Sequence, residues 1–376
     1  MRELDDERQM DFALTESQQE LAALTRQILA DHVTTKRQRE IEQSGVHVDR
    51  ELWQQLIASG VVGAVLPESV GSGGLDLLEL CSVLVELGRA VAPVPYLGHV
   101  VGTAAIGWFG TDEQCAEFAR PAAAGELLVT LALAEDFGSP EAPTTRAVAV
   151  DGGWQLTGSK AVVPAGTVAD VFVVPARTDD GAGVFLVRRD DEGVGITAQE
   201  LTDGDTGAAL DLTGVRLPAS RLVPGADTAH WIVARATIGT CAHQAGVLER
   251  ALELTAEYAR TREQFGRPIG SFQAVAQRLA DAYIDVEAVR LTMWEAAWRA
   301  AEPLPCPTEI ATAKFWAADA GHRVAHTAVH VHGGMGIDVD GPLHRYFVAA
   351  KLNEFSLGGA TAQLRAIGTE LANTPA

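Results

Sequence analysis

Cysteine is scarce in this sequence, and its few copies are scattered along the chain. Cys81, Cys115, Cys241 and Cys306 form no Cys-x-x-Cys pair. Disulfides are rare in reducing compartments, and isolated cysteines of this kind are typical of cytosolic proteins. We therefore predict four buried or free thiols in a cytoplasmic protein.

Long apolar runs are also missing. No run approaches the roughly 18–20 apolar residues that a membrane-spanning helix needs, because Gly, Pro or charged residues interrupt the longest stretches. The first eight residues, Met-Arg-Glu-Leu-Asp-Asp-Glu-Arg, lack the apolar core of a signal peptide. The sequence thus predicts neither a membrane span nor a secretion signal.

Basic residues are outnumbered by acidic ones. The chain has 29 Lys and Arg against 50 Asp and Glu, and its formal net charge is −21. Nucleic acids and anionic membrane surfaces are bound through clustered Lys and Arg. The charge balance therefore predicts no nucleic-acid partner and no membrane partner.

Three regions of different periodicity follow one another along the 376 residues. Residues 1–122 carry apolar stripes at helical spacing, residues 123–226 contain short β-rich runs between turn clusters, and residues 227–376 return to helical stripes. We predict an α+β protein, mainly α. Its three domains would be an N-terminal all-α domain, a middle antiparallel β-barrel or sandwich, and a C-terminal helical domain.

Individual elements are also predicted. Thr15, followed by an acid and then apolar residues at helical spacing, is typical of a helix N-cap. The β-rich runs are residues 127–133, 146–150, 154–157, 171–174, 183–187 and 209–212. Near the end, helices are expected at about 308–329 and 361–372, and the proline cluster 303–307 breaks the chain before the first of them.

Two motifs in the last region are more specific than the order of the regions. One reads Tyr-Ala-Arg-Thr-Arg-Glu-Gln-Phe-Gly-Arg-Pro-Ile-Gly-Ser-Phe-Gln at 258–273, and the other reads His-Val-His-Gly-Gly-Met-Gly at 330–336. In this order and spacing they resemble the flavin-binding half of acyl-CoA dehydrogenases. The resemblance covers essentially the whole chain. Its last 130 residues are most similar to the smaller partner subunits of actinobacterial members that degrade steroid side chains.

The resemblance implies a fold, a cofactor and partners. The fold would comprise a helical N-terminal domain, a middle antiparallel β-barrel and a C-terminal four-helix bundle. The cofactor would be FAD, the substrate an acyl-CoA thioester, and the electron acceptor an electron-transfer flavoprotein or a similar protein. In the subgroup named above, two different subunits share each flavin in an α2β2 assembly. A homologous catalytic subunit is therefore the implied partner, and a steroid side-chain acyl-CoA the implied substrate.

The first motif supplies candidate cofactor-binding residues. A guanidinium such as that of Arg262 can form bidentate contacts with phosphate oxygens, and an aromatic ring such as Phe265 can flank adenosine. The resemblance implies that Arg262, Gln264 and Phe265 reach across a dimer interface to the neighbour's flavin. The alternative is an arginine that caps a helix end beside a packed phenylalanine.

The second motif supplies His330, Gly333 and Gly334. Consecutive glycines let backbone N–H groups approach an oxyanion or a ring edge. Members of the family usually carry Gln at the position of His330, and either side chain can donate a hydrogen bond. The alternative is a helix C-cap in which the glycines are needed for steric reasons only. A metal site at His326, His330 and His332 is not predicted, because no Asp or Glu stands at a ligand spacing.

The catalytic carboxylate of the family has no counterpart in the sequence. Dehydrogenation of a thioester needs a base to remove the α-proton as the β-hydride moves to the flavin, and a dry pocket raises the pKa of such a carboxylate. The resemblance places that Glu at Leu357 or Gly358, or alternatively at Ala236. We therefore predict no catalytic residue in this chain. Glu354 is the nearest acid, although helical geometry would direct it elsewhere.

The middle domain departs from the family as well. A glycine-rich loop that cradles the flavin is replaced by Ala-Glu-Asp-Phe-Gly-Ser-Pro-Glu-Ala-Pro at 134–143. A Trp-Ile-Thr/Ser stretch after Gly-x-Lys is replaced by residues 161–166, where Pro164 removes a backbone donor. We infer that this chain cannot hold the isoalloxazine ring of a flavin of its own, unless other residues do the same task.

Arg345 matches a family arginine that follows a proline, here Pro342. We expect it to form a structural ion pair or an interface contact. The Arg-Asp pair that follows in the family is replaced by Val348-Ala349, so the sequence does not identify its partner.

Three functional hypotheses remain open at this point. The first is a flavin-sharing, catalytically silent subunit, which the retained 262–265 motif and the missing base favour. The second is a self-sufficient homo-oligomeric dehydrogenase with an atypical base such as Glu354. The third is a flavin-free scaffold that kept the fold as an interface or thioester-binding module.

Overall fold

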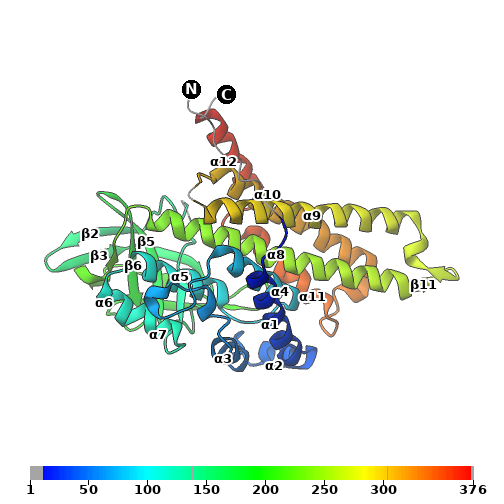
Figure 1. Ribbon diagram of the computed structural model, residues 1–376, viewed down its shortest axis with the longest axis horizontal. Helices are drawn as coiled ribbons and strands as arrows, with labels where there is room; N and C mark the ends of the chain where they lie inside the picture. Colours follow the sequence, from blue (N-terminus) through cyan, green and yellow to red (C-terminus); the bar gives the residue numbers. More distant parts are fainter. Residues whose placement is uncertain (1–11, 137–138, 303, 374–376) are drawn as a thin grey trace.

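The computed structural model describes residues 12–136, 139–302 and 304–373. Three sets of residues used above lie outside these ranges: residues 1–8, residues 137–138 and Pro303. Helices form both ends of the chain and strands form its middle, as expected (Figure 1). None of the described helices combines the length and the apolarity needed to cross a membrane. All four cysteines are buried and free, which confirms the prediction made from their spacing.

The N-terminal helices wrap one end of the long C-terminal helices (Figure 1). The first begins at Thr15, whose hydroxyl accepts from the N–H of Gln18 at 3.3 Å, while the Gln18 side chain accepts from the N–H of Thr15 at 3.0 Å. This capping box confirms the predicted N-cap. The α-helices of this region are α1 (Glu16–His32), α2 (Thr35–Gln43), α3 (Arg50–Ala58), α4 (Leu77–Ala90), α5 (Tyr96–Phe109), α6 (Asp112–Gln114) and α7 (Arg120–Ala123).

The strands of the middle region form two sheets. The larger contains β1 (Val129–Leu131), β2 (Arg146–Val150), β3 (Gly153–Thr157), β5 (Val171–Thr178), β6 (Gly181–Arg188), β9 (Arg216–Pro218) and β10 (Leu222–Val223). The smaller contains β4 (Ser159–Val163), β7 (Gly195–Glu200) and β8 (Thr206–Asp211). Most pairs are antiparallel, but β1 runs parallel to β5. The β-rich region is thus confirmed, and its described strands pair as two sheets, one of them mixed.

The C-terminal region is a helical bundle. It consists of α8 (Thr228–Thr261), α9 (Gln273–Ala301), α10 (Pro307–His332), α11 (Leu343–Phe355) and α12 (Ala360–Asn373). The first four pack on one another, while α12 contacts α10 and projects from the body of the molecule (Figure 1). The helices expected at 308–329 and 361–372 correspond to α10 and α12.

Strand β5 separates two hydrophobic clusters. Successive side chains of a strand point to opposite faces of the sheet. Val171 and Val173 therefore join the cluster shared with the N-terminal helices and the bundle, whereas Phe172 and Val174 join a second cluster inside the β-region. The sheet thus rests on the helices through one face, which fixes the β-region relative to α5 and α8.

Helices α4 and α8 approach each other at two glycines. A Cβ on Gly88 would stand 2.1 Å from the backbone oxygen of His243, and a Cβ on Gly246 would stand 1.9 Å from that of Val85. Real Cβ atoms are not found this close to backbone, so only glycine permits the crossing. The crossing anchors the N-terminal region on the bundle.

Replacing Gly246 by alanine tests this crossing. Because the added methyl meets backbone that cannot rotate away, we expect Gly246→Ala to lower the free energy of unfolding by at least the roughly 1–3 kcal/mol typical of overpacking. Gly368→Ala on α12 is the matched control. A Cβ there meets nothing within 4 Å, and alanine is the better helix former by up to about 1 kcal/mol. Urea unfolding followed by circular dichroism measures both, and equal effects would contradict the prediction.

Candidate functional site

A tight hairpin closes the far end of the bundle, between α8 and α9. Strands β11 (Glu263–Gln264) and β12 (Arg267–Pro268) pair across a two-residue turn at Phe265 and Gly266. Both turn residues have positive φ, 53° and 75°, as a type I′ turn requires. Phe265 is 92% exposed at the tip, and its ring packs edge-to-face with that of Phe272.

Arg262 lies where α8 ends and the hairpin begins. Its backbone N–H donates to the carbonyl of Tyr258 at 2.8 Å, and its own carbonyl accepts from the N–H of Ile269 at 2.8 Å. These bonds fix the backbone. The guanidinium itself is exposed, and within the described part of the chain it forms no hydrogen bond or ion pair. The Gln264 side chain is equally exposed and free of such partners among the described residues.

Helix α10 ends beside the same end of α8. The ring of His332 stacks on Tyr258 with centroids 4.3 Å apart, and the Tyr258 hydroxyl lies 3.7 Å from Sδ of Met335. The two motifs of the sequence are therefore neighbours in space. His330, two residues before the end of α10, is exposed.

The two glycines after α10 differ in what the fold requires of them. Gly333 is the C-cap, with φ 62° and ψ −141°, a conformation that suits glycine. At Gly334 the backbone does not need glycine, and a Cβ would meet nothing within 4 Å. Nothing in the fold of this chain alone therefore explains why residue 334 is a glycine. The open space beside its backbone would let an external group approach.

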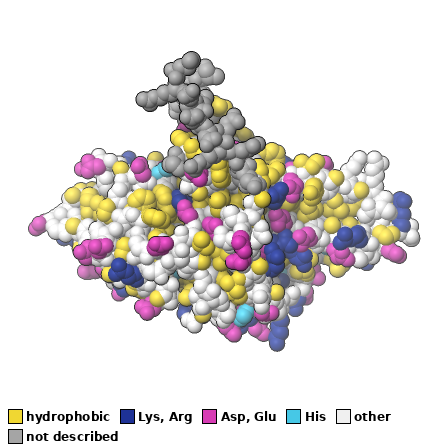
Figure 2. All heavy atoms as spheres, in the orientation of Figure 1, with side chains coloured by type: hydrophobic (Ala, Val, Ile, Leu, Met, Phe, Trp, Pro, Cys, Tyr) yellow, Lys and Arg dark blue, Asp and Glu magenta, His cyan; other side chains and the backbone are white. Residues whose placement is uncertain are grey.

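The end of the bundle that carries this hairpin exposes three arginines beside two acids, Glu257 and Glu263. Arg260, Arg262 and Arg267 are all exposed there, and dark blue side chains are visible at this end in Figure 2. The rest of the visible face is dotted with acidic groups. An unpaired guanidinium in such a setting can bind a phosphate in bidentate geometry.

A cavity of about 500 Å³ lies among the β-region, α5, α8 and the end of α11. Ala236 of α8 and Leu357, just beyond α11, both line it. Two of the positions at which the family resemblance places a catalytic Glu therefore line the same cavity. Leu357 has a positive φ of 56°, and its side chain packs against the hydrophobic cluster. Gly358, the other candidate position, follows in the turn.

The nearest acids are not placed as a general base would be. Glu354 does not line the cavity: its carboxylate pairs with the lining residue Lys351 and lies 3.3 Å from Nδ1 of His322 on α10. Among the lining residues described, only Glu200 is acidic, and it is exposed at the end of β7. A carboxylate in water lacks the desolvation that raises its basicity. Glu200 was missed from the sequence, because nothing local shows which end of a strand faces a helical bundle.

A buried ion pair occupies the place of the cradle loop. Nζ of Lys160 donates to Glu135 at 2.6 Å and to the carbonyl of Pro175 at 2.7 Å, and both partners of the pair are almost fully buried. Glu135 also accepts from the backbone N–H and hydroxyl groups of Thr144 and Thr145. Burial alone would raise the pKa of Glu135, but hydrogen bonds from Lys160 and the threonines lower it to about 2. The ends of the 134–145 loop are thereby held together.

The cavity wall next to this loop is largely apolar. It includes Leu131, Leu133, Val162 and Pro164. The Pro164 carbonyl accepts from the Thr130 hydroxyl at 2.7 Å, so that hydroxyl is also engaged. Hydrogen-bond donors that could hold a polar ring edge are therefore few on this wall.

Arg345 forms a structural ion pair, one of the two roles expected of it. Its guanidinium donates to both carboxylate oxygens of Glu42 at 2.6 and 2.9 Å and thereby joins α11 to α2. Among the described residues, no group of three or more His, Cys, Asp or Glu side chains could hold a metal ion.

Comparison with known proteins gives consistent results. Residues 15–126 match the model of the acyl-CoA dehydrogenase N-terminal domain, and residues 224–372 match that of the C-terminal domain. The chain is 50% identical to "Acyl-CoA dehydrogenase FadE27" of Mycobacterium tuberculosis, with 98% of this chain and 100% of that protein covered.

Solved structures agree. The ChsE4-ChsE5 complex from Mycobacterium tuberculosis contains a chain that is 50% identical, with a TM-score of 0.94 over 98% of this chain and all of that one. A variant of the Tcur3481-Tcur3483 steroid ACAD is 41% identical, with a TM-score of 0.91 over 95% of this chain and 98% of that one.

Replacing Lys160 by methionine tests the loop ion pair. Removal of one partner leaves a buried carboxylate without its counter-charge, so we expect Lys160→Met to lower the free energy of unfolding by about 3–5 kcal/mol at pH 7. Because the pKa of Glu135 is below its ordinary value, the stabilisation is complete at neutral pH and is lost as pH falls toward 2. Arg260→Ala, which breaks an exposed pair with Glu257, should change stability by less than about 1 kcal/mol. Urea titrations of both variants decide the matter, and a small effect of Lys160→Met would refute the assigned role.

Proposed function

This chain belongs to the acyl-CoA dehydrogenase family, and from that premise we propose that it is a flavin-sharing, catalytically silent subunit of an FAD-dependent acyl-CoA dehydrogenase. FAD, when bound, accepts the hydride in the dehydrogenation of a thioester. In this proposal Arg262, Gln264, Phe265 and the turn from His330 to Gly334 contact the ADP half of FAD. A homologous partner subunit supplies the ring site and the catalytic Glu.

One observation carries the proposal: Ala236 and Leu357 meet in a cavity whose described lining holds no buried acid. Proton abstraction from a thioester α-carbon needs a desolvated carboxylate. Glu354 is engaged by Lys351 and His322, and Glu200 is exposed to water. Neither residue meets that requirement.

The hairpin supports the cofactor-binding part of the proposal. An L-residue in the left-handed conformation costs on the order of 1–2 kcal/mol, and an exposed phenyl ring recovers little of it within this chain. Phe265 has that conformation while exposing 92% of its surface. The turn itself requires this conformation, but Gly, Asn or Asp would adopt it at lower cost. The choice of Phe therefore points to a function, and a ring that flanks a nucleotide beside Arg262 would account for it.

The length of α8 supports sharing between two chains. Ala236 lines the cavity and Thr261 ends the helix. At 1.5 Å per residue, these positions lie roughly 38 Å apart. One dinucleotide cannot connect the hairpin with the cavity of the same chain. A flavin held by Arg262 must therefore place its ring in another chain.

The partner and the substrate follow from the relatives. Two similar structures carry titles that pair two differently named proteins, ChsE4-ChsE5 and Tcur3481-Tcur3483, and the second is called a steroid ACAD. We propose by analogy an α2β2 assembly with a homologous catalytic subunit, two flavins per assembly, and a steroid side-chain acyl-CoA as substrate. An electron-transfer flavoprotein or a similar protein would reoxidise the flavin.

Purification alone and with the partner tests the proposal. We expect the chain expressed alone to carry little FAD and to show no turnover. The same chain co-expressed with a homologue that retains the Glu should give a yellow complex that forms enoyl-CoA. Absorbance near 450 nm and enoyl-CoA formation are the measurements. Strong flavin occupancy and turnover by this chain alone would support a self-sufficient enzyme instead.

Arg262→Ala should weaken FAD binding by the co-expressed complex. Loss of a charge-assisted, bidentate contact costs about 1.5–3 kcal/mol, which corresponds to roughly a 10- to 150-fold weaker affinity. Arg260→Ala is the control. Arg260 lies two residues before Arg262 and carries the same charge, but its side chain already pairs with Glu257. Equal losses of FAD affinity in the two variants would show that only the overall positive charge at this end matters, and not a specific contact of Arg262.

Glu354→Gln should leave turnover of the complex nearly unchanged, because the carboxylate faces α10. Glu200→Gln serves as a second variant, since Glu200 is the acid that lines the cavity. Steady-state rates with a saturating thioester provide the measurement. A loss of about 100-fold or more in either variant, the scale of a general base, would assign catalysis to this chain.

A further inference from the structure

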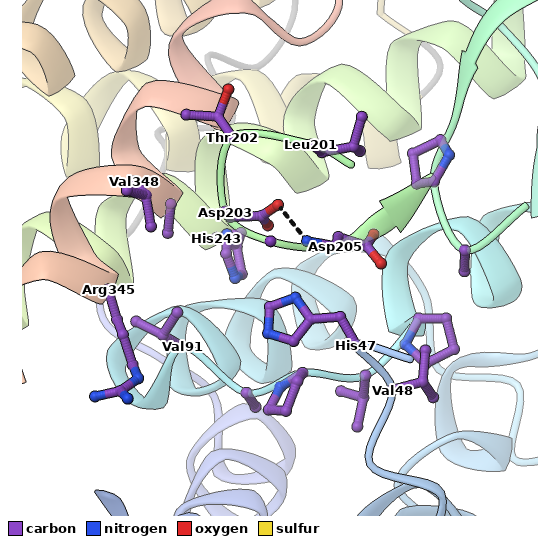
Figure 3. Close-up of a pocket in the computed structure, with 18 of the residues that line it drawn as sticks. His47, Val48, Val91, Leu201, Thr202, Asp203, Asp205, His243, Arg345 and Val348 are labelled. Carbon is purple, nitrogen blue, oxygen red and sulfur yellow. Dashed lines mark hydrogen bonds between the residues drawn. The ribbon is translucent and has the colours of Figure 1, made fainter. Parts of the chain in front are cut away.

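A second chamber of about 410 Å³ lies next to the cavity described above. The two chambers share lining residues from three places: residues 97–98, Thr130 with Pro164, and residues 200–202. The turn that connects β7 to β8 separates them, and a Cβ on its Gly204 would lie 3.9 Å from the ring of His47. Figure 3 shows Asp203 and Asp205 of this turn close to the rings of His243 and His47. The two chambers therefore adjoin, and each has a size typical of a small-molecule pocket.

The second chamber is polar on one side. His47, Asp203 and His243 gather around it (Figure 3). The amide of Asn353 donates to Nδ1 of His243 at 2.9 Å, so in the neutral ring Nε2 carries the proton. Burial lowers the pKa of both imidazoles, although Asp203 opposes this effect. Both rings are therefore neutral at pH 7 and can donate or accept a hydrogen bond.

The charge around the second chamber is negative. Glu42, Glu200, Asp203 and Asp205 line it, against one guanidinium, that of Arg345, which is paired with Glu42. At short range and reduced dielectric, like charges repel by several kcal/mol. An anionic head group, whether a carboxylate or the phosphates of CoA, is disfavoured here. A hydroxyl or a ketone can be hydrogen-bonded without this penalty.

We propose that the two chambers bind, without transforming it, a neutral amphipathic alcohol or ketone. Its apolar body would lie between Ala236, Leu357 and the wall at Val162. Its oxygen would accept from the Nε2–H of His243, and a hydroxyl could in addition donate to Asp203. The occupant is thus not a thioester. This site lies far along α8 from the hairpin, so it requires neither FAD nor the catalytic partner, and it goes beyond the proposed function.

Competition for a neutral fluorescent probe tests the site. Nile red is titrated into the purified full-length chain and into the co-expressed complex. Dodecan-1-ol, dodecanoate and dodecanoyl-CoA then compete for it. We expect saturable binding and at least tenfold better displacement by the alcohol than by either anion. Absence of saturable binding, or better displacement by the CoA thioester, would overturn the proposal.

Two variants and a control locate the binding. Val348→Trp fills the second chamber, whose lining includes Val348 (Figure 3), and should weaken displacement by dodecan-1-ol at least tenfold. Asp203→Asn keeps the side-chain acceptor used by the N–H of Asp205 and removes a charge. It should improve the displacement by dodecanoate at least threefold relative to that by dodecan-1-ol.

Leu364→Asp on exposed α12 is the control for probe binding to surface apolar groups, and it should change nothing. Loss of binding in Leu364→Asp together with unchanged binding in Val348→Trp would place the probe on the surface and refute the site. Circular dichroism confirms that each variant folds. The flavin absorbance of the complex, measured in the same samples, reports on the proposed function separately.

Discussion

The close crossing of α4 and α8 is the contact on which the rest of the architecture depends. Gly88 and Gly246 let backbone meet backbone, and this contact sets the N-terminal helices against the longest helix of the bundle. The larger sheet rests on the same apolar cluster through β1 and through one face of β5. The cavity walls come from all three regions of the chain. The crossing of α4 and α8 fixes the position of the N-terminal helices relative to the bundle.

Helix α8 carries two functional regions that lie far apart: the cavity near its start and the hairpin at its end. Near its start, Ala236 stands where the family can place a base, and the wall opposite is apolar. At its end, the hairpin presents a guanidinium without a partner among the described residues. Because Ala236 and Thr261 lie roughly 38 Å apart along the helix, side chains can change at one of these positions with no steric consequence at the other. The proposed loss of a base is therefore compatible with a retained nucleotide-binding hairpin.

The sequence predicted the elements whose signals are local. Thr15 is followed by Gln18 at the spacing of a capping box, and Arg146–Val150 has the composition of a strand, so both could be recognised without tertiary information. Strand β4 was missed because Lys160 argues against a buried strand, yet Glu135 neutralises it there. Strand β7 was missed because its exposed and buried residues do not alternate. The site motifs at 262–265 and 330–334 were found, but their proximity depends on the stack of Tyr258 on His332.

What replaces the missing groups is as informative as their absence. The loop that could have cradled a flavin ring is closed by Glu135, which takes hydrogen bonds from Lys160 and from both threonines that end the loop. This arrangement satisfies both charges of the buried Glu135–Lys160 pair locally. The described lining of the cavity beside Leu357 likewise holds no buried acid. In the role proposed here the chain ionises no substrate of its own, and a cavity with a largely apolar wall then suits a neutral ligand rather than a reactive one.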